Sequence, residues 1–172
     1  MSTKKLYDYN AYATEFEASV ISCEEVKITD KTDEEKVLYE VILDQTLFFP
    51  EEGGQTPDKG FLGEAEVVDV QIQKDVIKHF TKQPLESGSL VKGRIDWQHR
   101  FFNMQQHSGE HLFSGLAHRK YGLKNVGFHL SNQIVTMDFD KPLTEEQLKE
   151  MEWEINEAIV ANVEIKTGYP SK

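Results

Sequence analysis

Apolar and polar positions alternate in part over the first ninety-odd residues of the chain, which indicates β structure. Two stretches rich in β-branched and aromatic residues, 16–29 and 36–43, predict strands, and the acidic segment 30–36 predicts the turn that joins them. Three more candidate strands follow, over residues 63–73, 75–81 and 89–96. Short strands at this spacing, punctuated by glycine and proline, indicate a small barrel or a strongly bent sheet.

A helical period replaces this alternation near Asp96 and continues from Trp97 to Tyr121. Gly122 fits the residue type that ends such a helix. Several apolar residues share one broad face of the predicted helix: Phe101, Leu112, Phe113 and Leu116.

The remaining sequence predicts a hairpin, a second helix and a last strand. Residues 126–140 alternate, with Ser131–Gln133 near the turn, and residues 163–170 resemble a strand again. Thr144 and Gln147 have the spacing of a capping box. The apolar stripe of the helix that follows consists of Leu148, Met151, Ile155 and Ile159.

The change of pattern near residue 93 predicts two domains and an α+β fold class. We expect a small β-barrel domain with a glycine-rich loop over residues 1–93 and an α+β domain over residues 94–172. The 172 residues suffice for two small domains with a real core.

The composition limits the kind of protein this chain can be. Cys23 is the only cysteine, which excludes a disulfide or a multi-cysteine zinc site within the chain and fits a reducing cytosol. No apolar run approaches the ~20 residues that span a bilayer, and the first ten residues lack the hydrophobic segment of a signal peptide. We therefore expect a cytoplasmic protein with no membrane segment.

Charge is unevenly distributed along the chain. The net charge of −11 argues against a general nucleic-acid binder, because phosphate contacts require lysine and arginine. Residues 71–130 nevertheless carry nine basic and four acidic side chains, so this segment is +5. It could meet a phosphate backbone, and the alternative of solvated lysines around a core stays open.

Two histidines in the long predicted helix suggest a metal site. His107 and His111 lie four residues apart, so both imidazoles can reach one ion from one helix face. Gly109 between them costs up to ~1 kcal/mol in a helix interior, which suggests that something approaches closely there. An ordinary surface pair is the alternative. The same residues also read as HxxEH, in which Glu110 would be the general base of a metallopeptidase, but no third ligand is obvious downstream.

A glycine-rich loop is the second unusual stretch, over residues 43–60. Gly53 and Gly54 permit positive φ and let a ligand approach the backbone, and Gln55 can donate and accept hydrogen bonds. A well-made turn between two strands explains the same residues.

Together the two stretches resemble the alanyl-tRNA editing family, which comprises the editing domain of alanyl-tRNA synthetase and its free-standing relatives. Residues 46–60, TLFFPEEGGQTPDKG, look like the family motif TxFYPExGGQxxDxG, with Phe49 in place of the usual tyrosine. Residues 105–115, QQHSGEHLFSG, look like its HxxxH helix, and residues 126–140 are similar to the strand pair that usually follows. The resemblance covers nearly the whole chain, in order.

The resemblance implies an N-terminal β-barrel of translation-factor type and a C-terminal α+β editing domain shared with threonyl-tRNA synthetase. It implies hydrolysis of the ester that links a wrong amino acid, chiefly serine, to tRNA for alanine. It also implies zinc bound by His107 and His111. Thr46 is similar to the threonine whose hydroxyl reads the serine side chain, and Gln55 with Gly53 and Gly54 would shape the entrance. We take Thr46, Gln55 and Glu110 as candidate catalytic residues.

The sequence departs from the family pattern in two places. Glu110 stands where the synthetase version often has threonine. The family completes its metal site with a Cys-and-His motif after a strand like 163–170, whereas this chain ends at Lys172 and Cys23 does not match that motif. We therefore expect a fragment that binds zinc weakly and is a poor deacylase alone. A tRNA-binding or regulatory module without catalysis is the alternative from another class.

Overall fold

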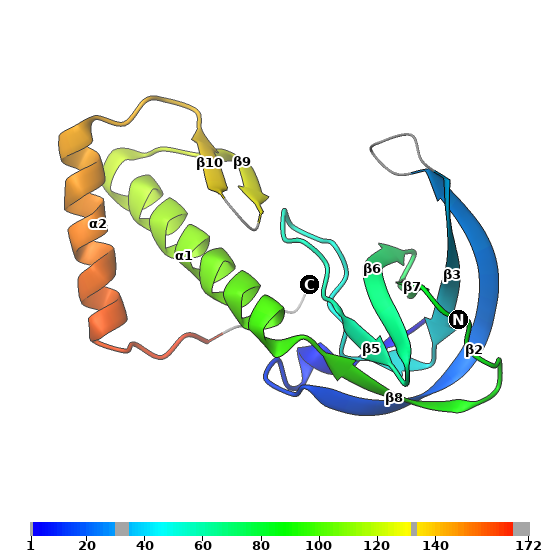
Figure 1. The fold of residues 1–172 in the computed structure, drawn as a ribbon. Coiled ribbons are helices and arrows are strands. Elements are labelled where there is room, and N and C mark those ends of the chain that lie inside the picture. Colours follow the sequence, from blue (N-terminus) through cyan, green and yellow to red (C-terminus); the bar gives the residue numbers. More distant parts are fainter. Residues whose placement is uncertain (1, 30–34, 132–133, 167–172) are drawn as a thin grey trace. The chain divides into compact units, whose positions relative to one another are not determined.

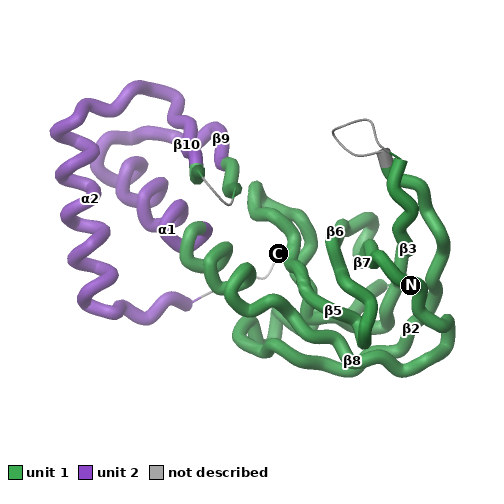
Figure 2. Tube along the Cα trace, in the orientation of Figure 1, with its two compact units in different colours: residues 1–106, 129–135 green, residues 107–128, 136–172 purple. Residues whose placement is uncertain are grey.

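The computed structural model describes residues 2–29, 35–131 and 134–166 of the chain. They form an α+β fold with a closed six-stranded barrel and two α-helices (Figure 1). The chain separates into two compact units, drawn in different colours in Figure 2. The first unit, called the barrel unit below, comprises residues 1–106 and 129–135; the second, called the helical unit, comprises residues 107–128 and 136–172.

The barrel is antiparallel throughout and closes on itself in the order β2-β3-β7-β6-β5-β8. Closure depends on the long strand β2, whose first part pairs with β8 and whose second part pairs with β3. A register shift between Val20 and Ser22 separates the two parts, as a β-bulge does where a strand bends. The barrel strands are β2 (Glu15–Thr29), β3 (Glu35–Leu43), β5 (Gly60–Leu62), β6 (Ala65–Gln73), β7 (Val76–Thr81) and β8 (Leu90–Ile95).

The barrel interior is filled by the inward residues of these strands. In β7 and β8 every second residue is buried, as expected for strands with one face toward a core. The buried apolar side chains that pack together are Tyr7, Ala18, Val20, Val41, Leu43, Phe48, Leu62, Val67, Val70, Ile77 and Val91. The short strand β1 (Lys4–Lys5) pairs in parallel with β4 (Gln45–Thr46), and the 3-10 helix η1 (Leu6–Asp8) follows β1.

Helix α1 (Trp97–Tyr121) begins in the barrel unit and ends in the helical unit. Gly122 adopts φ 66°, and its N–H donates to the His118 carbonyl at 2.9 Å, which ends the helix. Strands β9 (Asn125–Leu130) and β10 (Val135–Phe139) then pair with each other, and α2 (Glu145–Val160) follows.

The core of the helical unit lies where α1 meets α2. It consists of Leu116, Ala117, Leu123 and Met151. Thr144 caps α2: its hydroxyl accepts from the Gln147 N–H, and the Gln147 side chain accepts from the Thr144 N–H, as the capping-box spacing predicts.

Most of the secondary structure predicted from the sequence is confirmed, including both helices. Three short strands, β1, β4 and β5, were not predicted. The turn at 30–36 lies mostly outside the described residues. Residues 163–166 form no strand, and the rest of the last predicted strand, 167–170, also lies outside the described residues. The domain boundary near residue 93 stays a prediction.

The predicted apolar stripes are correct only in part. On α2, Met151 is buried and Ile155 packs against the core, whereas Leu148 and Ile159 are exposed. On α1, Leu116 is buried, but Phe101 is exposed and stacks on Trp97 with ring centroids 5.3 Å apart. In the described part of the chain, no helix is both long and apolar enough to cross a membrane.

Candidate functional site

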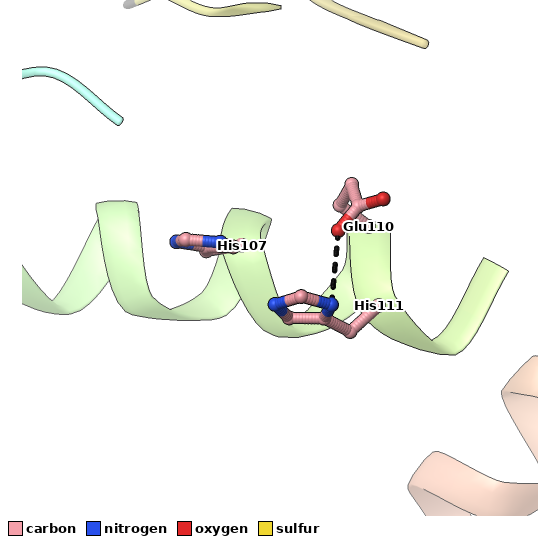
Figure 3. Close-up of side chains that lie close together, drawn as sticks. All are labelled: His107, Glu110 and His111. Atoms are coloured by element: carbon pink, nitrogen blue, oxygen red, sulfur yellow. Dashed lines mark ion pairs between the residues drawn. The ribbon is translucent and has the colours of Figure 1, made fainter. Parts of the chain in front are cut away.

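The histidine pair of α1 forms the centre of one candidate site. The His107 and His111 rings stack with centroids 4.9 Å apart and an interplanar angle of 18°. Figure 3 shows Glu110 beside His111 on the same helix. One nitrogen from each histidine and one oxygen from Glu110 lie within 4.8 Å of one another. The i, i+4 spacing therefore gathers three metal-binding groups, and it does so within one element.

The two imidazoles differ in their surroundings. The His111 side chain is 74% exposed, whereas His107 is half-buried against Phe128, with ring centroids 5.5 Å apart. Burial lowers the pKa of His107 below its usual value; the nearby charge of His111 lowers it further, and Glu110 partly opposes both. A lowered pKa keeps His107 neutral over more of the pH range, and the neutral imidazole is the form that binds metal.

Glu110 is almost fully buried and well supplied with hydrogen-bond donors. Its Oε1 accepts from Ser114 Oγ at 2.5 Å and from Asn125 Nδ2 at 2.7 Å. Its Oε2 lies 3.2 Å from His111 Nδ1, the contact dashed in Figure 3. Because Asn125 begins β9, the carboxylate ties the start of that strand to α1. Oε2 is the oxygen that faces His111.

The donor set of this group suits zinc. Imidazole nitrogen and carboxylate oxygen are both common zinc ligands, and catalytic zinc sites combine three such protein ligands with an open position. Calcium and magnesium prefer all-oxygen ligands, so the two histidines disfavour them. The chemistry of the three side chains is therefore compatible with the zinc ion that the family resemblance implies at His107 and His111.

The glycine loop lies between β4 and β5 in the barrel unit. Gly53 and Gly54 adopt φ 62° and 80°, a region that side-chain-bearing residues rarely enter. The Gln55 N–H donates to the Glu52 carbonyl at 3.1 Å and closes the turn. The Gly54 carbonyl accepts from the Leu130 N–H at 3.2 Å, and the Gln55 side chain is buried. The loop is thus an ordered turn with a buried glutamine.

A buried ion pair fixes both ends of this loop to the first turn of α1. Arg100 Nε donates to both carboxylate oxygens of Asp58 at 2.9 Å, and Nη2 donates to the Leu47 carbonyl at 2.6 Å. Nη1 donates to the Ala11 carbonyl at 3.1 Å, and Asp58 Oδ2 accepts from the Phe49 N–H at 2.7 Å. The side chains are 3% and 0% exposed, so the pair is desolvated and fully partnered.

Asn103, one turn further along α1, holds the same loop. Its Nδ2 donates to the Thr56 carbonyl at 3.2 Å, and the side chain is fully buried. His99 Nε2 lies 2.9 Å from the Pro57 carbonyl, so it donates to that oxygen. Three successive inward residues of α1 therefore set the position of the chain that follows Gln55.

Thr46, the predicted hydroxyl sensor, is fully buried at the end of β4. Its Oγ1 lies 2.8 Å from His79 Nε2 and accepts from the Phe48 N–H at 3.0 Å. His79 Nδ1 lies 3.1 Å from the Val41 carbonyl. Burial lowers the pKa of His79 to about 4, against a smaller opposing effect of that carbonyl, so the ring is neutral at pH 7.

The predicted site residues thus fall into two groups. Thr46, Gly53, Gly54 and Gln55 belong to the barrel unit, and His107, Glu110 and His111 belong to the helical unit. Sequence reasoning missed His79 and Arg100. His79 sits at an inward position of an alternating strand, which is an unusual place for histidine and a usable signal. Arg100 gives no such signal, because an arginine in a helix is usually solvated.

The chain is similar to curated proteins over most of its length. It is 37% identical over 155 residues to the mouse alanyl-tRNA editing protein Aarsd1. The matched region covers 87% of this chain and 38% of the mouse protein. It is 38% identical over 160 residues to Aarsd1-A of Xenopus laevis, covering 91% of this chain and 39% of the relative. Residues 1–99 match the model of the family tRNA synthetases class II (A). The chain belongs to this alanyl-tRNA editing and class II (A) synthetase family.

Family membership confirms the resemblance drawn from the two motifs. The alanine–tRNA ligase of Ignicoccus hospitalis is a further relative, 34% identical over 165 residues, covering 91% of this chain and 17% of the ligase. The chain spans about two fifths of the length of the editing proteins that it matches and less than a fifth of the ligase.

Proposed function

We propose that this chain takes part in the zinc-dependent hydrolysis of the ester that links serine to mischarged tRNA for alanine. The observation that carries the proposal is the convergence of His107, Glu110 and His111 on α1 in a chain whose relatives are named alanyl-tRNA editing proteins. The substrate is the acceptor end of the tRNA with its amino-acid ester, and the proposed location is the cytoplasm.

The proposal includes a finer view of the fold. Residues 1–93 are taken as a barrel of translation-factor type, and residues 94–172 as part of an editing domain of the threonyl- and alanyl-tRNA synthetase type. The six-stranded ring closed by β2 and β8 supports the first assignment. The long helix with paired histidines, followed by the β9–β10 pair, supports the second.

Each candidate residue then has a chemical task. Zinc, when bound, polarises an ester carbonyl and activates a water molecule. His107 and His111 hold the ion through neutral nitrogens, and Glu110 fixes the helix face that carries them. Thr46 recognises the serine hydroxyl, because a site built to bond a hydroxyl discriminates far better than one that relies on size. Gly53, Gly54 and Gln55 shape the approach of the ester.

The arrangement of Glu110 argues against the metallopeptidase alternative. A general base needs a carboxylate oxygen that is free to take a proton from water. Glu110 Oε1 already accepts from Ser114 and Asn125, and Oε2 is close to His111 Nδ1. These contacts favour a role for Glu110 in holding the histidine helix. The +5 charge of residues 71–130 supports contact with a tRNA phosphate backbone, whether or not the bound tRNA is hydrolysed.

Removal of either histidine tests the proposal. His107→Ala and His111→Ala should each lower zinc affinity by at least about tenfold, because each removes one of a small number of ligands. Deacylation of seryl-tRNA for alanine should fall in parallel, and the far-ultraviolet circular dichroism should not change. Zinc affinity is measured by competition with a chromogenic chelator, so the test does not depend on a high rate of turnover.

His118→Ala is the matched control, since it removes a histidine from the same helix seven residues beyond His111. Its zinc affinity should equal that of the wild type. If all three variants bind zinc as tightly as the wild type does, the His107–His111 pair binds no functional metal. That result would overturn the assignment of the site.

A further inference from the structure

His79 sits inside the barrel at a position that determines how its ring is protonated. The side chain is fully buried on β7, and Nδ1 lies 3.1 Å from the Val41 carbonyl oxygen. A carbonyl oxygen can only accept, so Nδ1 carries the proton and donates. In the neutral ring the other nitrogen, Nε2, then has no proton and can only accept.

The state of His79 determines the direction of the next hydrogen bond. Thr46 Oγ1 lies 2.8 Å from Nε2, so the single hydroxyl proton of Thr46 is donated to the histidine. The Phe48 N–H donates to the same oxygen at 3.0 Å. Thr46 has therefore used its only proton and one of its two lone pairs. A single acceptor position remains on Oγ1.

We propose that His79 fixes Thr46 as a hydrogen-bond acceptor, so that the substrate group recognised by Thr46 must be a hydrogen-bond donor. This inference rests on the proposed function, in which Thr46 recognises the amino acid, and it makes His79 a positioning residue. It defines the substrate class as an aminoacyl ester with a donor on its side chain. The hydroxyl of a seryl ester meets this requirement, and the methyl group of an alanyl ester does not.

The fixed direction improves selectivity. A hydroxyl that is free to rotate can donate or accept, so it tolerates several partners. An oxygen with its proton already committed gains a bond only from a donor, and an alanyl methyl group leaves its remaining lone pair unpaired. Buried polar groups left unpaired are the main source of discrimination between a hydroxyl and its absence.

Two substitutions of similar polarity separate the positioning role from a structural one. In His79→Gln the amide reaches the place of Nε2 and can present its oxygen to Thr46. In His79→Asn the shorter amide reaches only the place of Nδ1, so it can donate to Val41 and leaves the Thr46 proton uncommitted. The probes are two stable amide analogues of a charged tRNA end, 3′-seryl-amino-adenosine and 3′-alanyl-amino-adenosine.

We expect His79→Asn to lower the seryl-to-alanyl affinity ratio about fivefold, the equivalent of one ordinary hydrogen bond, and His79→Gln to keep it within about twofold of the wild type. Nitrogen-15 spectra of the wild-type protein should show the proton on Nδ1 of His79. Thermal unfolding of both variants serves as the control for a loss of fold.

Two results would overturn the inference: a proton on Nε2 of His79, or an unchanged affinity ratio in His79→Asn. Thr46→Val separates this failure from failure of the proposed function. If Thr46→Val keeps the wild-type ratio, or the wild type binds both analogues equally, then Thr46 does not read the amino acid and the wider proposal fails. If Thr46→Val changes the ratio and His79→Asn does not, only the role of His79 is refuted.

Discussion

Acidification should destabilise the barrel through one residue, His79. The ring is buried and neutral in the folded chain, with its pKa lowered to about 4 from 6.5. In the unfolded chain it is exposed and takes up a proton below about pH 6.5. Between these two values the unfolded state binds more protons than the folded state, so the free energy of unfolding falls as the pH falls from about 6.5 to about 4.

The size of this effect follows from the difference between the two pKa values. At about 1.4 kcal/mol for each pKa unit, the lowering of the His79 pKa to about 4 corresponds to a loss on the order of 3 kcal/mol over the whole window. Marginal domains have only about 5–15 kcal/mol in total, so the loss is a substantial fraction. The cause is physical: protonated His79 would be a charge in the barrel core that faces the Thr46 hydroxyl and the Val41 carbonyl.

Amide hydrogen exchange of the barrel strands measures this directly, because it reports the free energy of opening strand by strand. The comparison is between the wild type and His79→Gln at pH values from 7 to 4. Carboxylates and His107 titrate in both proteins, so their effects cancel in the difference. The wild type should lose on the order of 3 kcal/mol more than the variant over this range. Parallel curves for the two proteins would refute the assignment of a lowered pKa to a buried, neutral His79.

Two further substitutions test the contacts that hold the other elements. Asp58→Asn leaves Arg100 buried without a counter-charge and should lower the free energy of unfolding in urea by about 3–5 kcal/mol. The control Glu35→Gln removes an exposed partner of Lys27 and should lower it by less than about 1 kcal/mol. Similar losses in the two variants would contradict the burial argument. Thr144→Ala should destabilise α2 by about 1 kcal/mol while Thr144→Ser does not, as followed by helical circular dichroism; an equal loss in both would exclude the capping box as the cause.

The barrel was predictable from the sequence because its strands obey a local rule. The longer strands show partial alternation of apolar and polar residues, and the interior of a small barrel demands an apolar inward face. The strands missed, β1, β4 and β5, have only two or three residues each, too few for a period to show. The capping box at Thr144 was also predictable, since all of its contacts lie within three residues.

The site was predictable only where its chemistry is local. His107 and His111 are one helical turn apart, so their proximity follows from the sequence alone. The partners of Thr46 cannot be predicted in this way. His79 lies 33 residues away in the sequence, and its position opposite Thr46 depends on the pairing of β3 with β7. The ion pair of Asp58 and Arg100 joins residues 42 apart through the packing of a loop against a helix. Periodic sequence patterns do not predict contacts between residues so far apart in the chain.

The face that α1 buries explains why the apolar-stripe rule placed Phe101 wrongly. The buried side chains along this helix include Arg100, Asn103 and Glu110, followed by Leu116 and Ala117. Each of the three polar residues reaches a partner that local patterning cannot supply, in the loop before β5 or at the start of β9. A polar side chain can be buried without a large cost only when it has such partners. The buried polar residues of this helix therefore lie where the loop and the strand pack against it. An apolar side chain at position 100 would improve the stripe and leave the buried Asp58 carboxylate without its counter-charge. The residues that break the local pattern are therefore the ones that hold the glycine-rich loop and the start of β9 against this helix.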